Sequence, residues 1–302
     1  MRKSLFLLGV SALCAVAALA FEVPANKIVD SAWLKKNISD KSLVLIMVDR
    51  DKTYEKKHIA NSAKWSSAEF ASKTAAGLYI DLPSPEQFTE LAQKSGINKD
   101  SVVVFYGSGT DAANEAKAPE GLVIAEHFGI TKTAVLNGGL AGWEKMGGAV
   151  TAEVPADKKG NFVIGKMGNS IMQLAEVDKA VQAKSAAFVD ARAEKYFKGQ
   201  DDDKRLKEHG TIEGAVNIPA AALYDVVDGV AYFKKADEIK AIFQKAGVDG
   251  KKPLVAFCNT GHLTSSIWFA GKYIAGFKDA KNFKGSMVEY SNAEPARKVV
   301  KN

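Results

Sequence analysis

The sequence carries one pattern of apolar runs and turns twice, in two halves that are each about 140 residues long. Residues 102–106 match residues 254–258, and residues 58–63 resemble residues 211–219. A repeat of this length is typical of a domain and too long for a solenoid unit. We therefore expect two related domains joined in tandem.

Within each half, short apolar runs alternate with longer segments of helical periodicity. Residues 43–49 and 102–106 in the first half, and 186–190 and 254–257 in the second, are predicted strands. Strands that alternate with helices favour parallel sheets. The expected fold class is therefore α/β.

A polar, aperiodic segment at residues 150–160 is predicted to be the linker. It divides the remaining chain into domains at residues 21–155 and 156–302. The composition, 47% hydrophobic and 25% charged, is that of an ordinary soluble globular protein. Basic residues are spread among acidic ones despite the net charge of +6, so nucleic acid is not an expected partner.

The first twenty residues are predicted to be a secretory signal peptide. Met1, Arg2 and Lys3 form a basic start, residues 5–19 are apolar, and Ala18-Leu19-Ala20 is a small-x-small cleavage site. The alternative is an uncleaved anchor. No later segment is long enough to span a membrane. We therefore expect a periplasmic or secreted protein with no membrane span after cleavage.

Cleavage would remove Cys14 and leave Cys258 as the one thiol of the mature chain. Cys258 follows the apolar run 254–257 and precedes a predicted loop and a helix that starts near Thr264. Backbone N–H groups and a helix start in such a loop stabilise a thiolate. The alternative is a buried structural cysteine. The repeat places Tyr106 at the position of Cys258, so only the second half should be chemically active.

Other cysteine chemistries fit the sequence poorly. A cysteine phosphatase needs an arginine six positions after its nucleophile, and Thr264 stands there. One cysteine and four scattered histidines form no metal-ligand pattern, so no metal site is predicted. No CxxC motif is present for disulfide exchange.

The residues resemble those of the tandem-domain rhodanese-type sulfurtransferases over nearly the whole mature chain. The motifs follow one another in the family's order, and together they are far more specific than any one of them alone. They are residues 82–88, 135–143, 189–192, 214–219, the cysteine loop and 285–290.

The resemblance implies two rhodanese-like domains, each a parallel sheet flanked by helices, the first inactive and the second catalytic. Cys258 would take a sulfane sulfur from thiosulfate, a mercaptoacid or a polysulfide as a persulfide, and pass it to cyanide or a thiol. No cofactor is implied. Asp190 and Arg192 would brace the site, and the loop would bind the sulfur through its N–H groups. The loop residues are Asn259, Thr260, Gly261, His262, Leu263 and Thr264.

The loop departs from the family's pattern because it lacks an arginine or lysine beside the cysteine. His262 is its one titratable side chain, and it either contacts a donor sulfonate or has no role. Without a fixed cation, polysulfide or a thiol-derived sulfane donor becomes more plausible than thiosulfate. The strongly charged stretch 198–210 is expected to be an exposed loop.

Two other functions remain compatible with these residues. The protein could be a non-catalytic sulfur carrier that loads Cys258 and delivers sulfur to a partner protein. It could also be an interaction module that does not need Cys258 at all.

Overall fold

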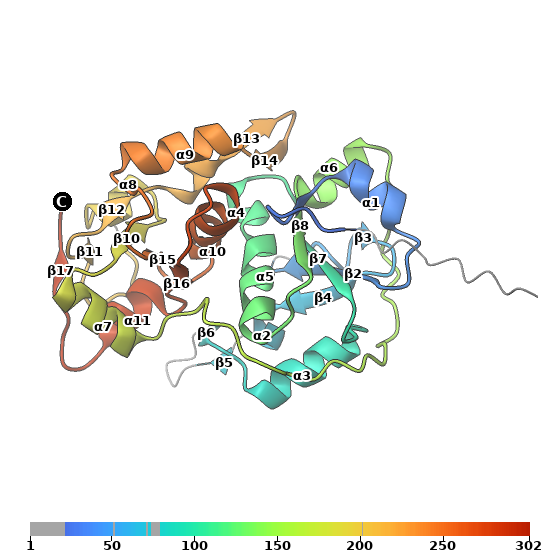
Figure 1. Ribbon diagram of the computed structural model, residues 1–302, viewed down its shortest axis with the longest axis horizontal. Helices are drawn as coiled ribbons and strands as arrows, with labels where there is room; N and C mark the ends of the chain where they lie inside the picture. The colour runs from blue at the N-terminus through green and yellow to red at the C-terminus, as the bar shows by residue number, and fades with distance from the viewer. Residues whose placement is uncertain (1–21, 51, 71, 74–78, 201) are drawn as a thin grey trace, which may run out of the picture.

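The computed structural model describes residues 22–50, 52–70, 72–73, 79–200 and 202–302. The predicted signal peptide, residues 1–20 with Cys14, lies outside the described residues. Two lobes stand side by side, one built by each half of the chain (Figure 1).

The first domain is built on a five-stranded sheet with the strand order β1-β8-β7-β2-β4, and all of its neighbouring strands are parallel (Figure 1). The central strands are rich in β-branched and aromatic residues and buried on both faces, as parallel strands covered by helices must be. The strands are β1 (Ile28–Val29), β2 (Leu43–Asp49), β4 (Ala63–Ser66), β7 (Val102–Tyr106) and β8 (Thr133–Leu136).

The second domain repeats this order in a four-stranded parallel sheet, β12-β10-β15-β16. An isolated parallel bridge between Ile171 and Asn282 occupies the place of β1. The predicted α/β class with two parallel sheets is confirmed. The strands are β10 (Ala187–Asp190), β12 (Val216–Asn217), β15 (Leu254–Phe257) and β16 (Ala280–Asn282).

Helices cover the faces of both sheets (Figure 1). Pro85 opens α3, where Ser84 and Gln87 form a capping box. The helices of the first domain are α1 (Ser31–Asn37), α2 (Ser67–Phe70), α3 (Pro85–Lys94), α4 (Ala112–Glu115), α5 (Lys117–His127) and α6 (Gly139–Lys145). Those of the second are α7 (Leu174–Ala183), α8 (Glu194–Phe197), η1 (Ala220–Leu223), α9 (Ala236–Lys245), α10 (Thr264–Phe269), the π-helical η2 (Ala270–Ile274) and α11 (Ser286–Asn292).

Short two-stranded ladders complete both domains. They pair β3 (His58–Ile59) with β9 (Val150–Thr151), β5 (Ser72–Lys73) with β6 (Tyr79–Asp81), β11 (Thr211–Ile212) with β17 (Val299–Val300), and β13 (Tyr224–Val227) with β14 (Val230–Phe233).

The two domains share an apolar interface in which α5 packs against α10 (Figure 1). One cluster of buried side chains contains residues of both domains, among them Phe128 and Phe269. A polar contact reinforces the interface, because Glu126 on α5 accepts hydrogen bonds from Lys272 (3.0 Å) and Tyr273 (2.5 Å) of the second domain. Burial of this kind holds the domains in one arrangement.

The structure corrects one detail of the predicted repeat. In the second domain, the N–H of Met287 donates to the carbonyl of Cys258 (3.1 Å). In the first, the equivalent bond runs from Leu140 to Gly107 (2.9 Å). Gly107, and not Tyr106, therefore takes the place of Cys258. An apolar run predicts that a strand forms. Only the hydrogen bonds from the neighbouring helix show which residue of one domain matches which residue of the other.

The correction leaves the first domain with no side chain at the nucleophile position. A Cβ added at Gly107 would lie 2.1 Å from the carbonyl oxygen of Asn114, so the backbone already fills that space. Tyr106 instead turns into the core, where its hydroxyl donates to Ser62 (2.7 Å) and burial raises its pKa.

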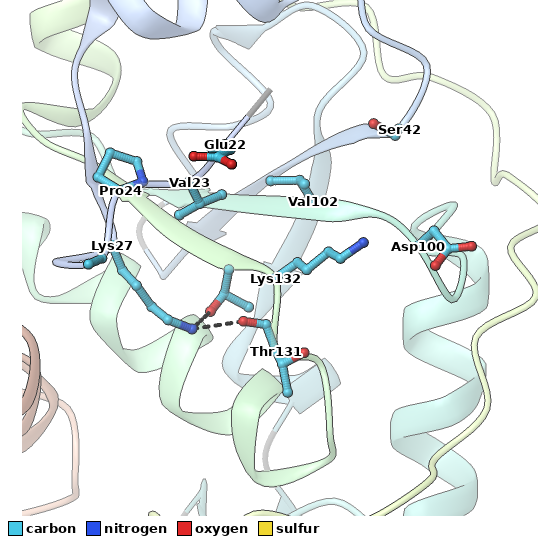
Figure 2. A pocket seen from close by; sticks show the side chains of 11 residues that line it. Glu22, Val23, Pro24, Lys27, Ser42, Asp100, Val102, Thr131 and Lys132 are labelled. Carbon is cyan, nitrogen blue, oxygen red and sulfur yellow. Dashed lines mark hydrogen bonds between the residues drawn. The ribbon is translucent and has the colours of Figure 1, made fainter. Parts of the chain in front are cut away.

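A pocket of about 490 Å³ lies at the amino ends of the first domain's strands (Figure 2). Ligands of α/β folds bind at the opposite, carboxyl ends. The Lys27 ammonium in this pocket already donates to Thr131 (2.8 Å), Thr133 (2.9 Å) and Glu126 (2.6 Å). We therefore assign it no ligand. Within the described residues, no helix is long and apolar enough to cross a membrane.

Candidate active site

Cys258 lies directly after β15, a central strand of the second sheet, and before α10. This is the carboxyl end of parallel strands, where α/β folds place their sites. The residue is 3% exposed. The N–H of Gly261 donates to its Sγ at 3.2 Å, a contact that favours a negatively charged sulfur.

Helix α11 forms hydrogen bonds with the start of the cysteine loop. The Cys258 N–H donates to Ser286 Oγ (3.1 Å), and the N–H of Val288 donates to the Asn259 carbonyl (3.0 Å). Ser286, which accepts the hydrogen bond from Cys258, has a left-handed backbone conformation (φ +53°). Strain of this kind persists only where the surrounding structure enforces it.

The backbone geometry at position 261 requires a glycine. Its φ is +81°, and a Cβ there would lie 2.2 Å from the carbonyl oxygen of Lys284. The loop can therefore curl toward Sγ only with glycine at this position.

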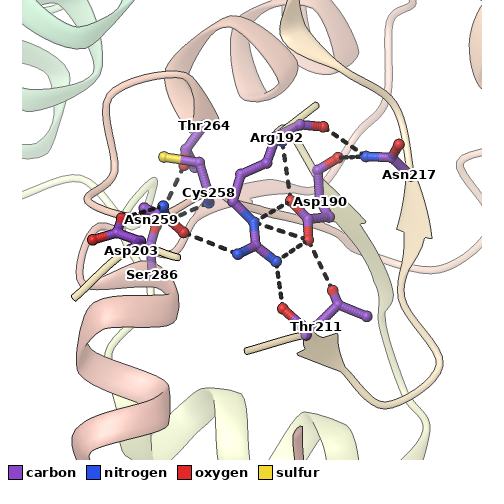
Figure 3. Close-up of polar contacts among 10 residues, drawn as sticks. Asp190, Arg192, Asp203, Thr211, Asn217, Cys258, Asn259, Thr264 and Ser286 are labelled. Atoms are coloured by element: carbon purple, nitrogen blue, oxygen red, sulfur yellow. Dashed lines mark hydrogen bonds and ion pairs between the residues drawn. The ribbon is translucent and has the colours of Figure 1, made fainter. Parts of the chain in front are cut away.

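Asp190 and Arg192 form a buried ion pair beside the loop (Figure 3). Arg192 donates to the two carboxylate oxygens from Nε (2.9 Å) and Nη2 (2.6 Å), and the Thr211 hydroxyl also donates to the carboxylate (2.9 Å). The remaining guanidinium nitrogen, Nη1, donates to Asn259 Oδ1 (2.9 Å). The pair thus orients the residue next to Cys258, as the predicted bracing role requires.

The charged stretch predicted to be an exposed loop folds partly onto the site. Asn259 donates to Asp203 (2.8 Å), which in turn binds Arg205 through two hydrogen bonds of 2.8 and 2.5 Å. Leu206 is buried. Arg205 is thereby joined to the loop through Asp203 and Asn259, and negative charge on the Cys258 sulfur would favour the charged form of Arg205 and raise its pKa. A cation missing from the loop sequence is thus supplied from some fifty residues upstream.

Lys284 is a second cation at the site that the sequence did not reveal. Its side chain is 3% exposed, and its ammonium donates to the Thr260 carbonyl (3.4 Å). Burial lowers its pKa, whereas the nearby Glu120 carboxylate and Cys258 sulfur favour the charged form. The cysteine loop itself gives no sign of either cation, because Arg205 lies in the charged stretch 198–210 and Lys284 lies directly before the motif 285–290.

His262 is placed differently from the expected donor contact. Its Nδ1 meets Glu120 Oε2 and its Nε2 meets the Ala113 carbonyl, both at 2.8 Å and both in the first domain. With both ring nitrogens engaged there, His262 connects the loop to the neighbouring domain.

The last two loop residues have supporting positions. Thr264 is buried and its hydroxyl lies 3.4 Å from that of Ser286. It does not cap α10, which begins without a side-chain cap after Leu263. Leu263 is partly buried against the core. Within the described residues no cluster of His, Cys, Asp or Glu is arranged to hold a metal ion.

A comparison with known protein families shows the family to which the chain belongs. The sequence model of the Rhodanese-like domain matches residues 30–146 and again residues 173–293. The chain belongs to the rhodanese family. It carries two rhodanese-like domains in tandem.

Curated relatives match over most of their length. The sulfur carrier protein TtuD of Thermus thermophilus is 28% identical over 88% of this chain and 93% of that protein. Thiosulfate sulfurtransferase of Gallus gallus is 29% identical over 82% of this chain and 83% of that protein. These names support sulfur transfer in general and leave the donor and acceptor open.

Solved structures share the rhodanese fold. The 3-mercaptopyruvate sulfotransferase SseA of Escherichia coli has a TM-score of 0.74 and 24% identity, and covers 86% of this chain and 98% of its own. An anaerobic ergothioneine biosynthesis enzyme of Chlorobium limicola has a TM-score of 0.78 and 20% identity, and covers 92% of this chain and 71% of its own. At these identities the likeness concerns the fold.

Gly261→Ala should damage the site more than its dihedral angle alone explains. Gly276 is a matched control, because it has the same φ of +81° but no atom within 4 Å of an added Cβ. Gly276→Ala should lower the free energy of unfolding by about 1 kcal/mol. Gly261→Ala should lower it further and reduce the rate of sulfur transfer about a hundredfold, because the loop must shift. Thermal unfolding and a sulfur-transfer assay measure both effects; equal behaviour of the two variants would contradict the required close approach.

Proposed function

We propose that the protein is a sulfurtransferase that carries sulfane sulfur as a persulfide on Cys258. The observation that supports this most is the position of Sγ, which accepts a backbone N–H inside a curled loop at the carboxyl end of the sheet. Such a loop suits a sulfur that is anionic both before and after loading.

In the first step, the Cys258 thiolate attacks the outer sulfur of the donor. With thiosulfate, the new S–S bond forms as the bond between the two thiosulfate sulfurs breaks, and sulfite leaves with the electron pair. The negative charge on Cys258 moves one atom outward, onto the persulfide. The loop N–H groups and the two cations remain in place to stabilise it.

In the second step, a thiolate or cyanide attacks the outer persulfide sulfur. The acceptor leaves as a persulfide or as thiocyanate, and the electron pair of the broken S–S bond restores the Cys258 thiolate. No net oxidant or cofactor is needed, because one sulfur atom moves between two nucleophiles.

We propose an anionic donor of the thiosulfate or mercaptoacid class. The loop sequence alone favoured polysulfide, because it lacks a cation. Arg205 and Lys284 supply positive charge to the same sulfur from other segments. A negatively charged sulfonate or carboxylate would gain from both.

Stoichiometric delivery of sulfur to a partner protein is the second candidate. It is favoured by the relative that is named a sulfur carrier protein. The same loaded cysteine serves either function. Repeated turnover with a small thiol or cyanide marks an enzyme, whereas a single loading that only a partner protein discharges marks a carrier.

Loading of Cys258 can be measured directly by intact mass. After incubation with thiosulfate, the protein should be heavier by one sulfur atom, and cyanide should remove that mass. Cys258→Ser should lose both the adduct and more than about a thousandfold of the transfer rate, because the nucleophile is gone. Because the serine side chain is close in size to that of cysteine, circular dichroism should show an unchanged fold. Transfer that persists in Cys258→Ser would contradict the mechanism.

Arg205 should contribute to donor binding more than to the chemical step. Arg205→Gln should raise the KM for thiosulfate about tenfold with a smaller change in kcat, because one charge-assisted contact is lost. Lys207→Gln is the control, since Lys207 lies in the same stretch but pairs with Glu294 at the surface. If both variants raise the KM equally, the effect comes from the overall charge of the protein and not from a contact between Arg205 and the donor.

We also propose that residues 1–20 direct export and are removed. The protein purified from its natural host should then begin near Phe21 when its N-terminus is sequenced. Recovery of the full-length chain from the cytoplasm would contradict export.

A further inference from the structure

The first domain places a buried carboxylate against the cysteine loop of the second. Glu120 lies on α5 and is completely buried. Its Oε1 accepts from Arg50 (2.6 Å) and lies 3.5 Å from the Lys284 ammonium. Its Oε2 meets His262 Nδ1 at 2.8 Å. One carboxylate of the first domain thus contacts the side chains of His262 and Lys284 in the second domain.

The ring of His262 lies between two hydrogen-bond acceptors of the first domain. Glu120 Oε2 is an ionised acceptor, because its neighbouring cations outweigh burial and hold the pKa of Glu120 well below its usual range. The Ala113 carbonyl opposite Nε2 is also an acceptor. Both ring nitrogens therefore donate only when His262 is an imidazolium.

Lys284 depends on the same carboxylate. An ammonium that is 3% exposed loses its hydration, and an anion in contact offsets that loss. Glu120 is this anion, and the Cys258 sulfur is the next negative group that favours the charged lysine. Within the described residues, the charged groups that face Glu120 are Arg50, His262 and Lys284.

We propose that Glu120 is a positioning residue of the active site. From the first domain, its carboxylate holds the His262 ring in place and stabilises the Lys284 ammonium beside the Cys258 loop, and so sets the positive potential that an anionic donor meets. The domain without a nucleophile is thereby part of the catalytic site. The relevance to sulfur donors depends on the proposed function, whereas the potential at Cys258 does not.

The potential can be measured without sulfur transfer. Iodoacetate and iodoacetamide alkylate a thiolate by the same reaction and differ chiefly in charge, so the ratio of their rates reports the field at Sγ. The rates are obtained at pH 8 from the mass of the peptide that contains Cys258. Glu120→Gln should lower the ratio of iodoacetate to iodoacetamide rates about fivefold or more, because the uncharged amide no longer stabilises the Lys284 ammonium.

Glu126→Gln is the matched control. Glu126 lies on the same helix and also binds the second domain, but through Lys272 and Tyr273 on η2 and not through the loop. Its ratio should stay within about twofold of the natural protein's, because the groups at Sγ keep their charge.

The other outcomes of the experiment separate the proposal from its alternatives. Equal losses of the ratio in both variants would show that only domain docking matters. An unchanged or higher ratio in Glu120→Gln would show that the cations keep their charge without Glu120. If Glu120→Gln fails to fold, Lys284→Met must lower the ratio instead, and an unchanged ratio overturns the proposal. If the ratio falls as expected but thiosulfate loads no sulfur, the proposed function fails and this inference stands.

Discussion

The proposed sulfur transfer requires negative charge on a sulfur atom that is almost shielded from water, and the rest of the site depends on this constraint. Cys258 is 3% exposed, so water cannot solvate a thiolate or a persulfide there as it does at a surface. In the proposed mechanism, the Gly261 N–H, the guanidinium of Arg205 and the ammonium of Lys284 would replace that solvation. Each comes from a different part of the chain. The fold therefore has to bring separate segments to the end of β15 before the cysteine can act.

The duplication of the fold explains how these segments reach the site. Both domains keep the same strand order, and both hold the loop after the central strand with N–H groups from the helix after the next strand. The second domain places Cys258 there; the first has Gly107 and no room for a side chain. Its α5 instead packs on α10 and carries Glu120 to the loop. The first domain thus has no side chain at the nucleophile position, but it contacts the loop that carries Cys258.

The sequence predicted the α/β class, the two domains and the loop of Cys258 because each depends on local patterns. Apolar runs mark parallel strands, and the glycine at 261 marks a curled loop. The pairing of Tyr106 with Cys258 was wrong by one residue, because a uniformly apolar run does not carry its own register. Arg205, Lys284 and Glu120 were missed, since they join the loop through tertiary contacts between distant segments. His262 was singled out as the loop's one titratable side chain; a contact with the donor stays a prediction, and the partners that the structure shows lie in the other domain.

The central claim is that Cys258 holds a persulfide inside the loop that the structure shows. A crystal structure of the protein after reaction with thiosulfate tests it most directly. We expect an additional sulfur bonded to Sγ, within hydrogen-bond distance of loop N–H groups, with the Asn259–Arg192 contact retained. An unmodified Sγ in a protein that nevertheless transfers sulfur, or a persulfide that points away from the loop with these contacts broken, would contradict the account.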